Sequence, residues 1–335
     1  MVDAALIWEW IIKSLVLIIF LTVGFMYVTV YERRFLARIQ SRIGPNRVGP
    51  FGLFQPAADG LKLIFKEELI PASADKFIFI LAPILTVIPA LIVLAVMPWG
   101  ESLWIFGRQV DLLISDVNVA VIYIMAVTSI SVYGITLAGW SSNNKYALLG
   151  GLRATAQMIS YELSLGLSFM GPIILAGSLS MMDIVRAQQS SVWYVLLQPV
   201  GFIIYFFASI AEINRAPFDM PEAEQELTAG YHAEYSGMKF ALFFMAEYIK
   251  MIVISAIGAT LFFGGFDGPF VAQVPWLGPI YLLLKIIIYL GVLIWVRASW
   301  PRLRYDRLMQ LGWKILFPLA LLNVVITAVI VVLVS

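Results

Sequence analysis

The sequence predicts an all-α integral membrane protein with eight transmembrane helices and one amphipathic helix in the membrane interface. Apolar and aromatic residues make up 61% of the 335 residues and charged residues only 13%, whereas soluble domains carry about 25% charged residues. The apolar residues form continuous stretches of about 20, the length that crosses a bilayer, and they do not alternate as in a membrane β-barrel. A soluble enzyme, a secreted disulfide scaffold and a disordered chain are therefore excluded.

Each of the eight apolar stretches is expected to form one membrane-spanning helix, and together they form a single membrane domain, residues 1–335. The stretches are Trp8–Tyr31, Phe77–Met97, Val117–Ala138, Thr155–Leu175, Val192–Ala211, Phe240–Phe263, Trp276–Val296 and Leu311–Val334. Asp3 precedes the first stretch and Glu9 lies at its start, with no basic segment before them, which favours a helix over a signal peptide. Pro83 and Pro89 interrupt the second span, where we expect kinks.

Basic residues are concentrated on one side of the predicted membrane domain. Eight spans place both termini on one side and four connecting segments on the other. Those four segments hold 17 of the 22 lysines and arginines. The positive-inside rule assigns this side to the cytoplasm, so both termini are expected on the outer side, which is the periplasm in a bacterium.

The first inner segment, residues 32–76, predicts a helix that continues out of span one and then an interfacial helix. Three arginines recur along the first helix at every fourth position: Arg34, Arg38 and Arg42. The Gly- and Pro-rich residues 42–52 end this helix, and Ala57–Glu68 predicts an amphipathic helix in the plane of the interface. Two functions are open. The helix binds anionic phospholipid head groups, or it holds open a slot through which an amphiphile enters from the lipid.

The second inner segment, residues 212–238, is acidic. It holds six of the chain's 21 acids: Glu212, Asp219, Glu222, Glu224, Glu226 and Glu234. A solvated acidic loop is the simplest interpretation. Against it, side chains that favour burial alternate with the acids: Phe218, Met220, Leu227 and Tyr231. Crowded carboxylates in a poorly solvated place raise one another's pKa, so the pattern indicates a proton-relay or charge-sensing element.

Away from the ends of the predicted spans lie four charged residues: Glu162, Glu247, Lys250 and Lys285. Each costs on the order of several kcal/mol in hydrocarbon unless it faces a partner or water. Glu247 and Lys250 are three positions apart and can form a structural ion pair. Glu162 has no cation within one helical turn, which favours a functional role.

Redox cofactors are expected on partner chains. The sequence has no cysteine and one histidine, His232, so it lacks the ligands for an iron–sulfur cluster, a bis-histidine haem or the usual zinc sites. No metal site is predicted. The near-balance of 22 basic and 21 acidic residues argues against nucleic acid as a partner.

Long motifs occur in order along nearly the whole chain. They are Glu32–Arg34, Arg42–Leu63, Asn144–Ala154, Gln157–Gly166, Pro217–Gly230 (PFDMPEAEQELTAG), Ala233–Gly237, Ala241–Tyr248 (ALFFMAEY) and Pro301–Met309. On these residues the sequence resembles subunit 1, known as the H subunit in bacteria, of respiratory complex I, the proton-translocating NADH:quinone oxidoreductase. The outer loops carry no such motif.

The resemblance implies a membrane subunit that joins the electron-carrying hydrophilic arm of complex I to its proton-pumping arm. Quinone, the substrate, would enter from the bilayer between span one and the interfacial helix. This chain would take no direct catalytic part and bind no cofactor, while partner subunits would carry flavin mononucleotide and iron–sulfur clusters. The implied partners are the hydrophilic quinone-site subunits, adjacent small membrane subunits and phospholipid. A bacterial inner membrane is favoured over mitochondrial or plastid membranes.

The same resemblance implies two sets of site residues. The quinone channel would be bordered by Arg33, Arg42, Asp59, Lys62, Glu67, Arg215 and Tyr235. The proton relay would consist of Glu162, Glu212, Asp219, Glu222, Glu224, Glu226, Glu234 and Glu247. Ubiquinone, menaquinone and plastoquinone all fit, because the quinone tail meets only apolar walls.

Three alternatives remain open from the sequence. The first is the homologous membrane subunit of a membrane-bound hydrogenase or a deazaflavin-linked dehydrogenase. The second is an ion-coupled secondary transporter, which would need charges at the bilayer midplane and an internal repeat. The third is a passive anchor for a soluble dehydrogenase, which would explain the basic loop but not Glu162 or the acidic segment.

Overall fold

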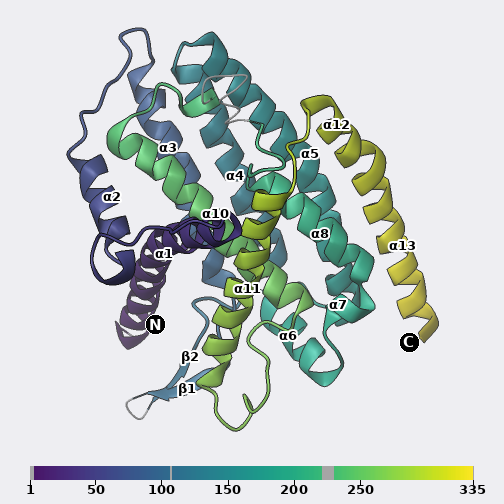
Figure 1. Cartoon of the computed structure of the whole chain (residues 1–335). Helices are drawn as coiled ribbons and strands as arrows, with labels where there is room; N and C mark the ends of the chain where they lie inside the picture. The colour runs from purple at the N-terminus through teal and green to yellow at the C-terminus, as the bar shows by residue number, and fades with distance from the viewer. Residues whose placement is uncertain (1–3, 106–107, 221–229, 335) are drawn as a thin grey trace.

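Helices form nearly all of the structure, a computed structural model that describes residues 4–105, 108–220 and 230–334 (Figure 1). The α-helices are α1 (Ala4–Ile39), α2 (Gln55–Ile64), α3 (Lys76–Ile92), α4 (Ala120–Ser141), α5 (Lys145–Ala176), α6 (Met181–Ser190), α7 (Tyr194–Leu197), α8 (Pro199–Glu212), α10 (Gly237–Phe262), α11 (Leu277–Ser299), α12 (Tyr305–Gln310) and α13 (Phe317–Val334). Short 3-10 turns occur at Pro50–Gly52, Val93–Val96 and Gly230–His232, and the π-helical turn Leu311–Leu316 joins α12 to α13.

Seven helical stretches of the described residues are long and apolar enough to cross a membrane, which confirms a helical membrane protein. They are Ile7–Ile39, Lys76–Val96, Ala120–Ser141, Lys145–Ala176, Gly237–Phe262, Leu277–Ser299 and Tyr305–Val334. Each corresponds to one of the eight predicted spans. The remaining predicted span, Val192–Ala211, is divided in the structure.

The division of that span falls at Gln198. Its backbone leaves the helical region (φ −128°, ψ 53°) before Pro199, because the proline ring disfavours a helical conformation in the residue that precedes it. Pro199 then begins α8, which has 14 residues and a length of about 21 Å. The Gln198 amide binds α13 by donating to Thr327 Oγ1 at 2.6 Å and accepting from Asn323 Nδ2 at 2.9 Å. At the break in the helix, the Gln198 side chain is therefore buried and hydrogen-bonded to α13.

The loop between α3 and α4 contains a β-hairpin, which the sequence did not predict. Strands β1 (Ser102–Ile105) and β2 (Arg108–Asp111) pair antiparallel, with Leu103 opposite Val110. Four-residue strands are too short to give a recognisable alternation. The hairpin is a small addition to a fold that is otherwise helical, as predicted, and it lies at one end of the molecule, here called the hairpin end (Figure 1).

The first inner segment folds largely as predicted. α1 continues to Ile39, well past its first apolar stretch, and α2 begins at Gln55 with Pro56 in its first turn, where a missing N–H costs nothing. The predicted amphipathic helix extended to Glu68, but α2 ends at Ile64. The chain beyond it binds the start of α10 instead, because Ser236 Oγ accepts from the Leu69 N–H at 3.2 Å and donates to the Glu67 carbonyl at 3.1 Å.

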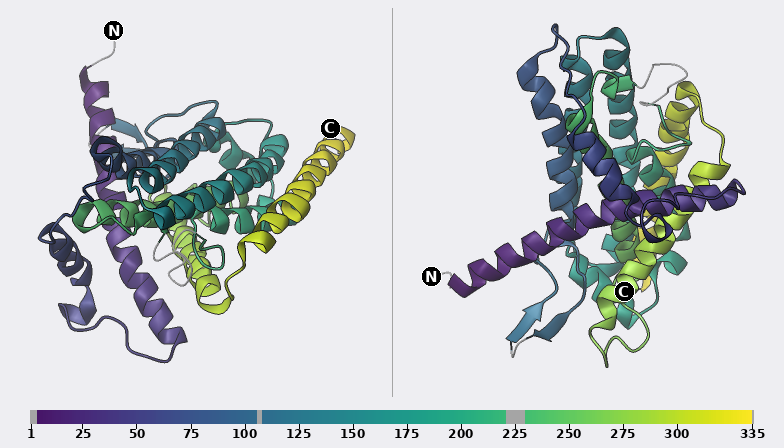
Figure 2. Two further views of the ribbon diagram at one scale, coloured as in Figure 1. Left: turned by 90° about the horizontal axis from the view of Figure 1, so that it is seen from above. Right: turned by 60° about the vertical axis from the view of Figure 1, so that its left-hand side comes forward.

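α10 occupies the centre of the bundle and contacts α1, α3 and α11, while α4, α5 and α8 pack in sequence beside α3. α1 crosses the other helices obliquely, and α13 lies at the opposite edge against α5 and α8 (Figure 2). Both edge helices leave most of their apolar side chains exposed. These faces suit lipid or partner helices.

Glycines allow α5 to approach its neighbours closely. A Cβ on Gly150 would lie 2.7 Å from Gly230 Cα and 2.9 Å from the Tyr231 nitrogen, so only glycine fits this contact. The contact places the Gly230–His232 turn, and with it the described end of the acidic segment, against α5.

We expect Gly150→Ala to destabilise the protein by about 1–3 kcal/mol, because the added methyl group meets backbone atoms that cannot rotate away. Gly60→Ala is the matched control, since a Cβ there meets nothing within 4 Å and alanine favours a helix. Chemical unfolding of the purified protein in detergent measures both effects. Equal stability of the two variants would contradict this packing.

Candidate functional site

A cluster of four charged side chains, of which Arg297 is the most exposed and the other three are largely buried, joins α1, the loop after α8, α10 and α11. Arg215 Nη1 donates to Glu32 Oε1 at 2.7 Å, and Arg215 Nε donates to Glu247 Oε1. Arg297 Nη1 also donates to Glu32 Oε1. The Glu32 side chain is 2% exposed and that of Arg215 9%. Two carboxylates and two guanidinium groups balance one another, as buried charges require; we call these four residues the ion cluster.

Arg215 is held at the centre of the ion cluster by an aromatic ring as well as by the acids. Its guanidinium carbon lies 4.4 Å from the centroid of the Tyr248 ring, a cation–π contact. Burial by itself would lower the pKa of Arg215, but the carboxylates of Glu247 and Glu32 raise this pKa well above its ordinary value. Arg215 therefore stays protonated.

The sequence analysis identified two of the four members of the ion cluster, Arg215 and Glu247. It missed the other two, Glu32 and Arg297, and also Tyr248, whose ring contacts Arg215. The sequence did contain one indication that Glu32 is a site residue: it is an acid directly before Arg33 and Arg34 in an otherwise basic stretch. The ion pair that the spacing of Glu247 and Lys250 allowed is replaced by the pair between Glu247 and Arg215.

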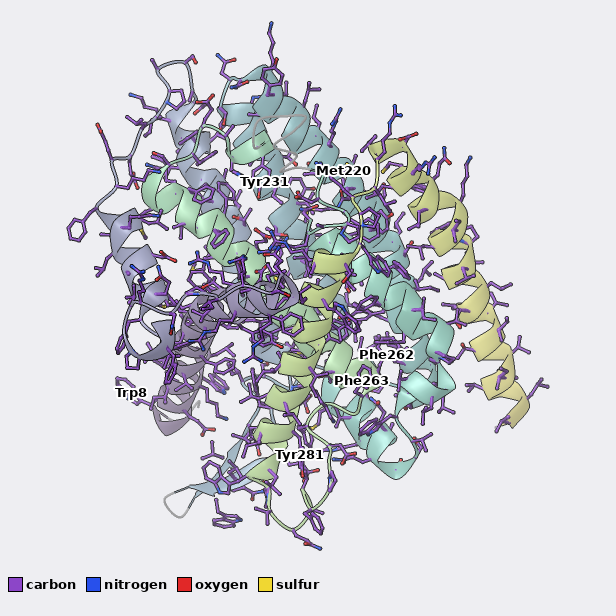
Figure 3. The ribbon with its side chains drawn as sticks, in the orientation of Figure 1. Trp8, Met220, Tyr231, Phe262, Phe263 and Tyr281 are labelled. Carbon is purple, nitrogen blue, oxygen red and sulfur yellow. The ribbon has the colours of Figure 1, made fainter. Side chains whose placement is uncertain are left out.

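The described ends of the acidic segment are packed rather than solvated. Phe218, Met220 and Tyr231 are all buried, as predicted; Met220 and Tyr231 lie at the end of the molecule opposite the hairpin (Figure 3). Glu234 accepts from Asn144 Nδ2 at 2.6 Å, and Asp219 is half-buried. Leu227 and three predicted relay acids lie outside the described residues: Glu222, Glu224 and Glu226.

Tyr235 is anchored on α3 rather than in a large cavity. Its ring stacks on Phe79 with centroids 3.9 Å apart, and its hydroxyl donates to the Phe79 carbonyl at 3.2 Å. Burial raises the pKa of Tyr235 to about 12. The hydroxyl is therefore a hydrogen-bond donor at neutral pH and not a phenolate.

Two further predicted relay acids lie deeper between the helices. Glu162 of α5 accepts from Ser129 Oγ of α4. Glu212, the last residue of α8, is 4% exposed, and Lys250 of α10 interacts electrostatically with both acids. Gln157 fixes this region by donating to the carbonyls of Ala211 and Phe218, each at 2.8 Å. These charges form a second group, separate from the ion cluster.

An apolar cavity of about 450 Å³ lies between α1, α2 and α10. Its polar wall includes three of the predicted channel residues: Arg33, Asp59 and Lys62. Arg33 Nη1 donates to Asp59 Oδ2 at 2.6 Å and so ties α1 to α2. Lys239 of α10 pairs with Glu68 just beyond α2. α2 is thus fastened at its middle through Asp59, and the chain just beyond its C-terminal end is fastened through Glu68.

The other predicted channel residues lie away from this cavity's lining. Arg42 is exposed and its Nε donates to Gln40 Oε1 at 2.7 Å. Glu67 is exposed, and its carbonyl accepts from Ser236. Arg215 lies in the ion cluster and Tyr235 on α3. The structure therefore brings three of the seven predicted channel residues together.

A second apolar cavity, of about 710 Å³, lies between α8, α10 and α11 toward the hairpin end. Phe263 and Tyr281, which Figure 3 labels, contribute to its lining. Lys285 also lines it, but its ammonium donates to the carbonyls of Phe263, Gly265 and Asp267 at 2.6 to 2.8 Å. All three donors of Lys285 are used to close the end of α10, which is a structural role.

No metal site is formed within the described ranges, where no group of three or more His, Cys, Asp or Glu side chains has a suitable arrangement. The site consists instead of an apolar cavity, the ion cluster and the deeper acids around Lys250. Such an arrangement can bind an amphiphile and respond to a change of charge.

Comparison with known proteins agrees with the resemblance found in the sequence. The family model described as NADH dehydrogenase matches residues 12–328. The H subunit of the NADH-quinone oxidoreductase of Thermomicrobium roseum is 53% identical over 313 residues, covering 91% of this chain and 90% of the relative. The H subunit from Protochlamydia amoebophila is 53% identical over 302 residues (90% and 91%). An H subunit from Geobacter sulfurreducens is 49% identical over 330 residues (95% and 94%).

We expect Arg215→Leu to lower the free energy of unfolding by about 3–5 kcal/mol, because Glu32 and Glu247 would lose a buried partner. Arg304→Leu is the control. Arg304 pairs with Asp306 at 3.2 Å where both side chains are largely exposed, and such a pair contributes about 0–1 kcal/mol. Chemical unfolding in detergent measures the difference, and similar losses in both variants would show that the cluster is not stabilising.

Proposed function

The chain belongs to the NADH dehydrogenase family, and on that premise we propose that it forms the membrane wall of the quinone channel of a respiratory complex I and couples quinone reduction to proton translocation. The apolar cavity between α1, α2 and α10, with its wall of Arg33, Asp59 and Lys62, carries this proposal. The names of the relatives support it, since they are subunits of NADH-quinone oxidoreductases. Flavin mononucleotide and iron–sulfur clusters then belong to partner subunits.

Quinone reaches this cavity sideways from the lipid. Its wall combines apolar side chains, such as Phe25 and Met245, with the ion-paired Arg33 and Asp59. This combination suits a molecule with a long apolar tail and a polar head group. α2 lies beside α1 and α10 as an interfacial helix, and its lysine also contacts phospholipid head groups. Arg42, Glu67, Arg215 and Tyr235 complete the channel toward the hydrophilic subunits.

Coupling is electrostatic. Two electrons on a buried quinone create negative charge, which protons drawn from nearby carboxylates neutralise. Asp219, Glu222, Glu224, Glu226 and Glu234 supply them, and the charge change then reaches Glu247 in the ion cluster. Because buried charges interact over long distances at low effective dielectric, this change biases Glu212 and Glu162. The burial of Glu212 and of the ion cluster supports this reading.

The proposed placement is a bacterial inner membrane with eight crossings, α7 and α8 together making the fifth, and both termini on the periplasmic side. The 17 basic residues of the four inner segments support this orientation. The exposed apolar faces of α1 and α13 suit neighbouring small membrane subunits and lipid. The hydrophilic quinone-site subunits then dock on the inner face.

We expect Ala241→Trp to raise the KM for a long-tailed quinone about tenfold, because Ala241 lines the cavity and tenfold corresponds to about 1.4 kcal/mol of binding. Ala57→Trp is the matched control, since Ala57 is exposed on α2 and lines no part of this cavity. Steady-state kinetics of the assembled complex, with NADH oxidation by a water-soluble acceptor as a reference, measure both. An unchanged KM in Ala241→Trp would exclude this route.

We expect Glu162→Gln to leave assembly intact and to lower quinone-linked proton translocation by about ten- to a hundredfold, since glutamine keeps the shape but cannot exchange a proton. Glu224→Gln is expected to act in the same direction. The control is Glu101→Gln, an exposed acid of the loop between α3 and α4. Acidification in proteoliposomes per NADH oxidised gives the result, and normal pumping in both relay variants would remove the mechanism.

A further inference from the structure

The apolar cavity of about 710 Å³ between α8, α10 and α11 has no part in the proposed quinone channel; we call it the lateral cavity. α11 packs mainly on α10 and α1, and the lateral cavity separates it from α8. Leu284, Ile288 and Val292 of α11 line the cavity, although their side chains are between 38% and 59% exposed. Because exposed apolar side chains of a membrane helix face lipid or a partner, the lateral cavity opens sideways toward the hydrocarbon of the bilayer.

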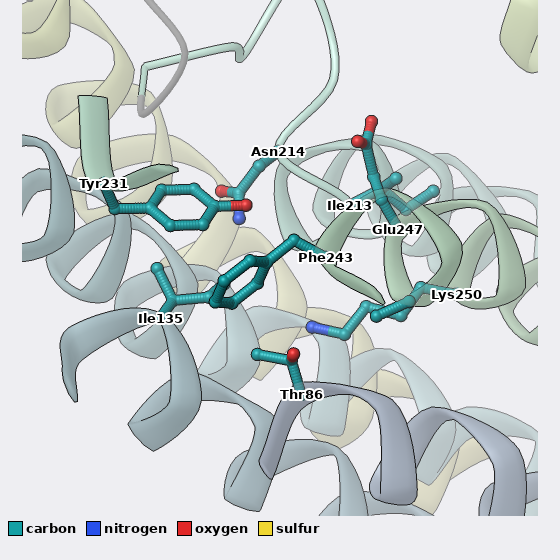
Figure 4. A pocket seen from close by; sticks show the side chains of 9 residues that line it. Thr86, Ile135, Ile213, Asn214, Tyr231, Phe243, Glu247 and Lys250 are labelled. Carbon is teal, nitrogen blue, oxygen red and sulfur yellow. The ribbon is translucent and has the colours of Figure 1, made fainter. Parts of the chain in front are cut away.

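The length of the lateral cavity matches that of a lipid acyl chain. Along α11 its lining runs from Tyr281 to Val292, eleven positions or about 16 Å of helix, and one leaflet of the hydrocarbon core is about 15 Å thick. The cavity at Lys250, which Figure 4 shows with Thr86 and Glu247 in its lining, offers a comparison. Its volume is about 20 Å³, which is room for one water molecule and not for a chain.

The end of the lateral cavity nearest the hairpin is aromatic and polar. Trp193 and Tyr281 line this end together with Asp267 and Lys285, in the region where α10 has ended and α11 begins. Trp and Tyr are enriched where the hydrocarbon meets the lipid head groups. A lipid whose chain fills the cavity therefore places its head group beside Asp267.

The Asp267 carboxylate is the charged group at this end that is available to a head group. The Lys285 ammonium donates to three backbone carbonyls and lies 5.1 Å from the centroid of the Trp193 ring. It has no proton left for a lipid phosphate, although its charge interacts with that of Asp267. Within residues 4–105, 108–220 and 230–334 no group donates a hydrogen bond to the half-buried Asp267 carboxylate.

These charges favour one class of lipid head group, a cationic N–H donor. The primary ammonium group of phosphatidylethanolamine can donate to Asp267 in a charge-assisted hydrogen bond. The choline group of phosphatidylcholine has no N–H to donate. The negative charge of phosphatidylglycerol would meet a carboxylate, and the protons of the neighbouring Lys285 are already used.

We propose that the lateral cavity binds one phosphatidylethanolamine molecule, with an acyl chain between α8 and α11 and the ammonium group on Asp267. In the proposed orientation this lipid belongs to the outer leaflet. The inference does not depend on the quinone channel, because the two cavities contact opposite ends of α10. The lateral cavity is lined by Ala259 and by Phe263 just beyond α10, and the other cavity by Met238 and Met245.

The test uses the complete complex in detergent and a phosphatidylethanolamine that carries a photoreactive diazirine on one acyl chain. After illumination, mass spectrometry of the peptides locates the label, which we expect on the residues that line the lateral cavity. Unlabelled phosphatidylethanolamine should displace the probe at about tenfold lower concentration than phosphatidylcholine or phosphatidylglycerol, because only its head group donates to Asp267.

Two pairs of variants test the head-group and chain contacts separately. Asp267→Asn should abolish the preference for phosphatidylethanolamine, whereas Asp111→Asn, an exposed acid of β2 at the same end of the molecule, should keep it. Ile288→Trp should lower labelling about tenfold, because its larger side chain occupies the cavity. Ile287→Trp is the matched control, since Ile287 is 50% exposed and lines no part of this cavity.

NADH oxidation by a water-soluble acceptor reports assembly of each variant, and Val292→Trp replaces Ile288→Trp if the latter does not assemble. Equal labelling in the Ile288 and Ile287 variants, or equal displacement by the three lipids, would overturn the inference. Absence of label from the native cavity, as when a helix of a neighbouring subunit fills it, would overturn it as well. Because no measurement here uses quinone, a failure of the proposed quinone channel would leave these results unchanged.

Discussion

The pairing of buried charges is the constraint on which this structure depends. A charged group between membrane helices is tolerated only where an opposite charge or water meets it. The charge of Glu32 on α1 is met in this way, because one of its carboxylate oxygens accepts hydrogen bonds from both Arg215 and Arg297. Because Arg215 also binds Glu247, the short loop after α8 joins α1 to α10, and Arg297 joins α11 to the same oxygen of Glu32. A change of protonation in the ion cluster would therefore alter ion pairs that join three helices, α1, α10 and α11.

The cavity under α2 follows from how that helix is fastened. Ion pairs hold it to its neighbours, Arg33 with Asp59 on α1 and Lys239 with Glu68 on α10. One of these contacts lies at the middle of α2 and the other just beyond its C-terminal end, and a cavity of about 450 Å³ remains between α1, α2 and α10. This cavity and the ion cluster thus share two helices, α1 and α10. Under the proposed function, the shared helices connect a quinone in the cavity to the charges of the ion cluster.

The two lysines inside the long apolar helices, Lys250 and Lys285, differ in the groups that surround their ammonium nitrogens. Lys285 donates all its protons to carbonyls at the end of α10 and completes the helix. Lys250 lies between two cavities and three acids. Lys285 also lies over the Trp193 ring and lines the larger apolar cavity, so the two ammonium groups have different surroundings. An ionisable residue in a span therefore marks a functional site only when its protons are not already committed.

The sequence by itself determined the membrane environment, seven of the eight predicted spans, the amphipathic α2 and the burial of Phe218, Met220 and Tyr231, because each depends on local composition and periodicity. It also marked Arg33, Asp59 and Lys62, which line one cavity. Only the tertiary structure decided that Glu247 pairs with Arg215 and that Arg297 meets Glu32 across 265 positions of the chain. The β-hairpin likewise depends on pairing between two strands, whereas the break at Gln198 follows from Pro199, a local signal that the prediction of an uninterrupted span did not use. Pairing of this kind depends on how helices cross, and no local pattern of residues encodes a crossing angle.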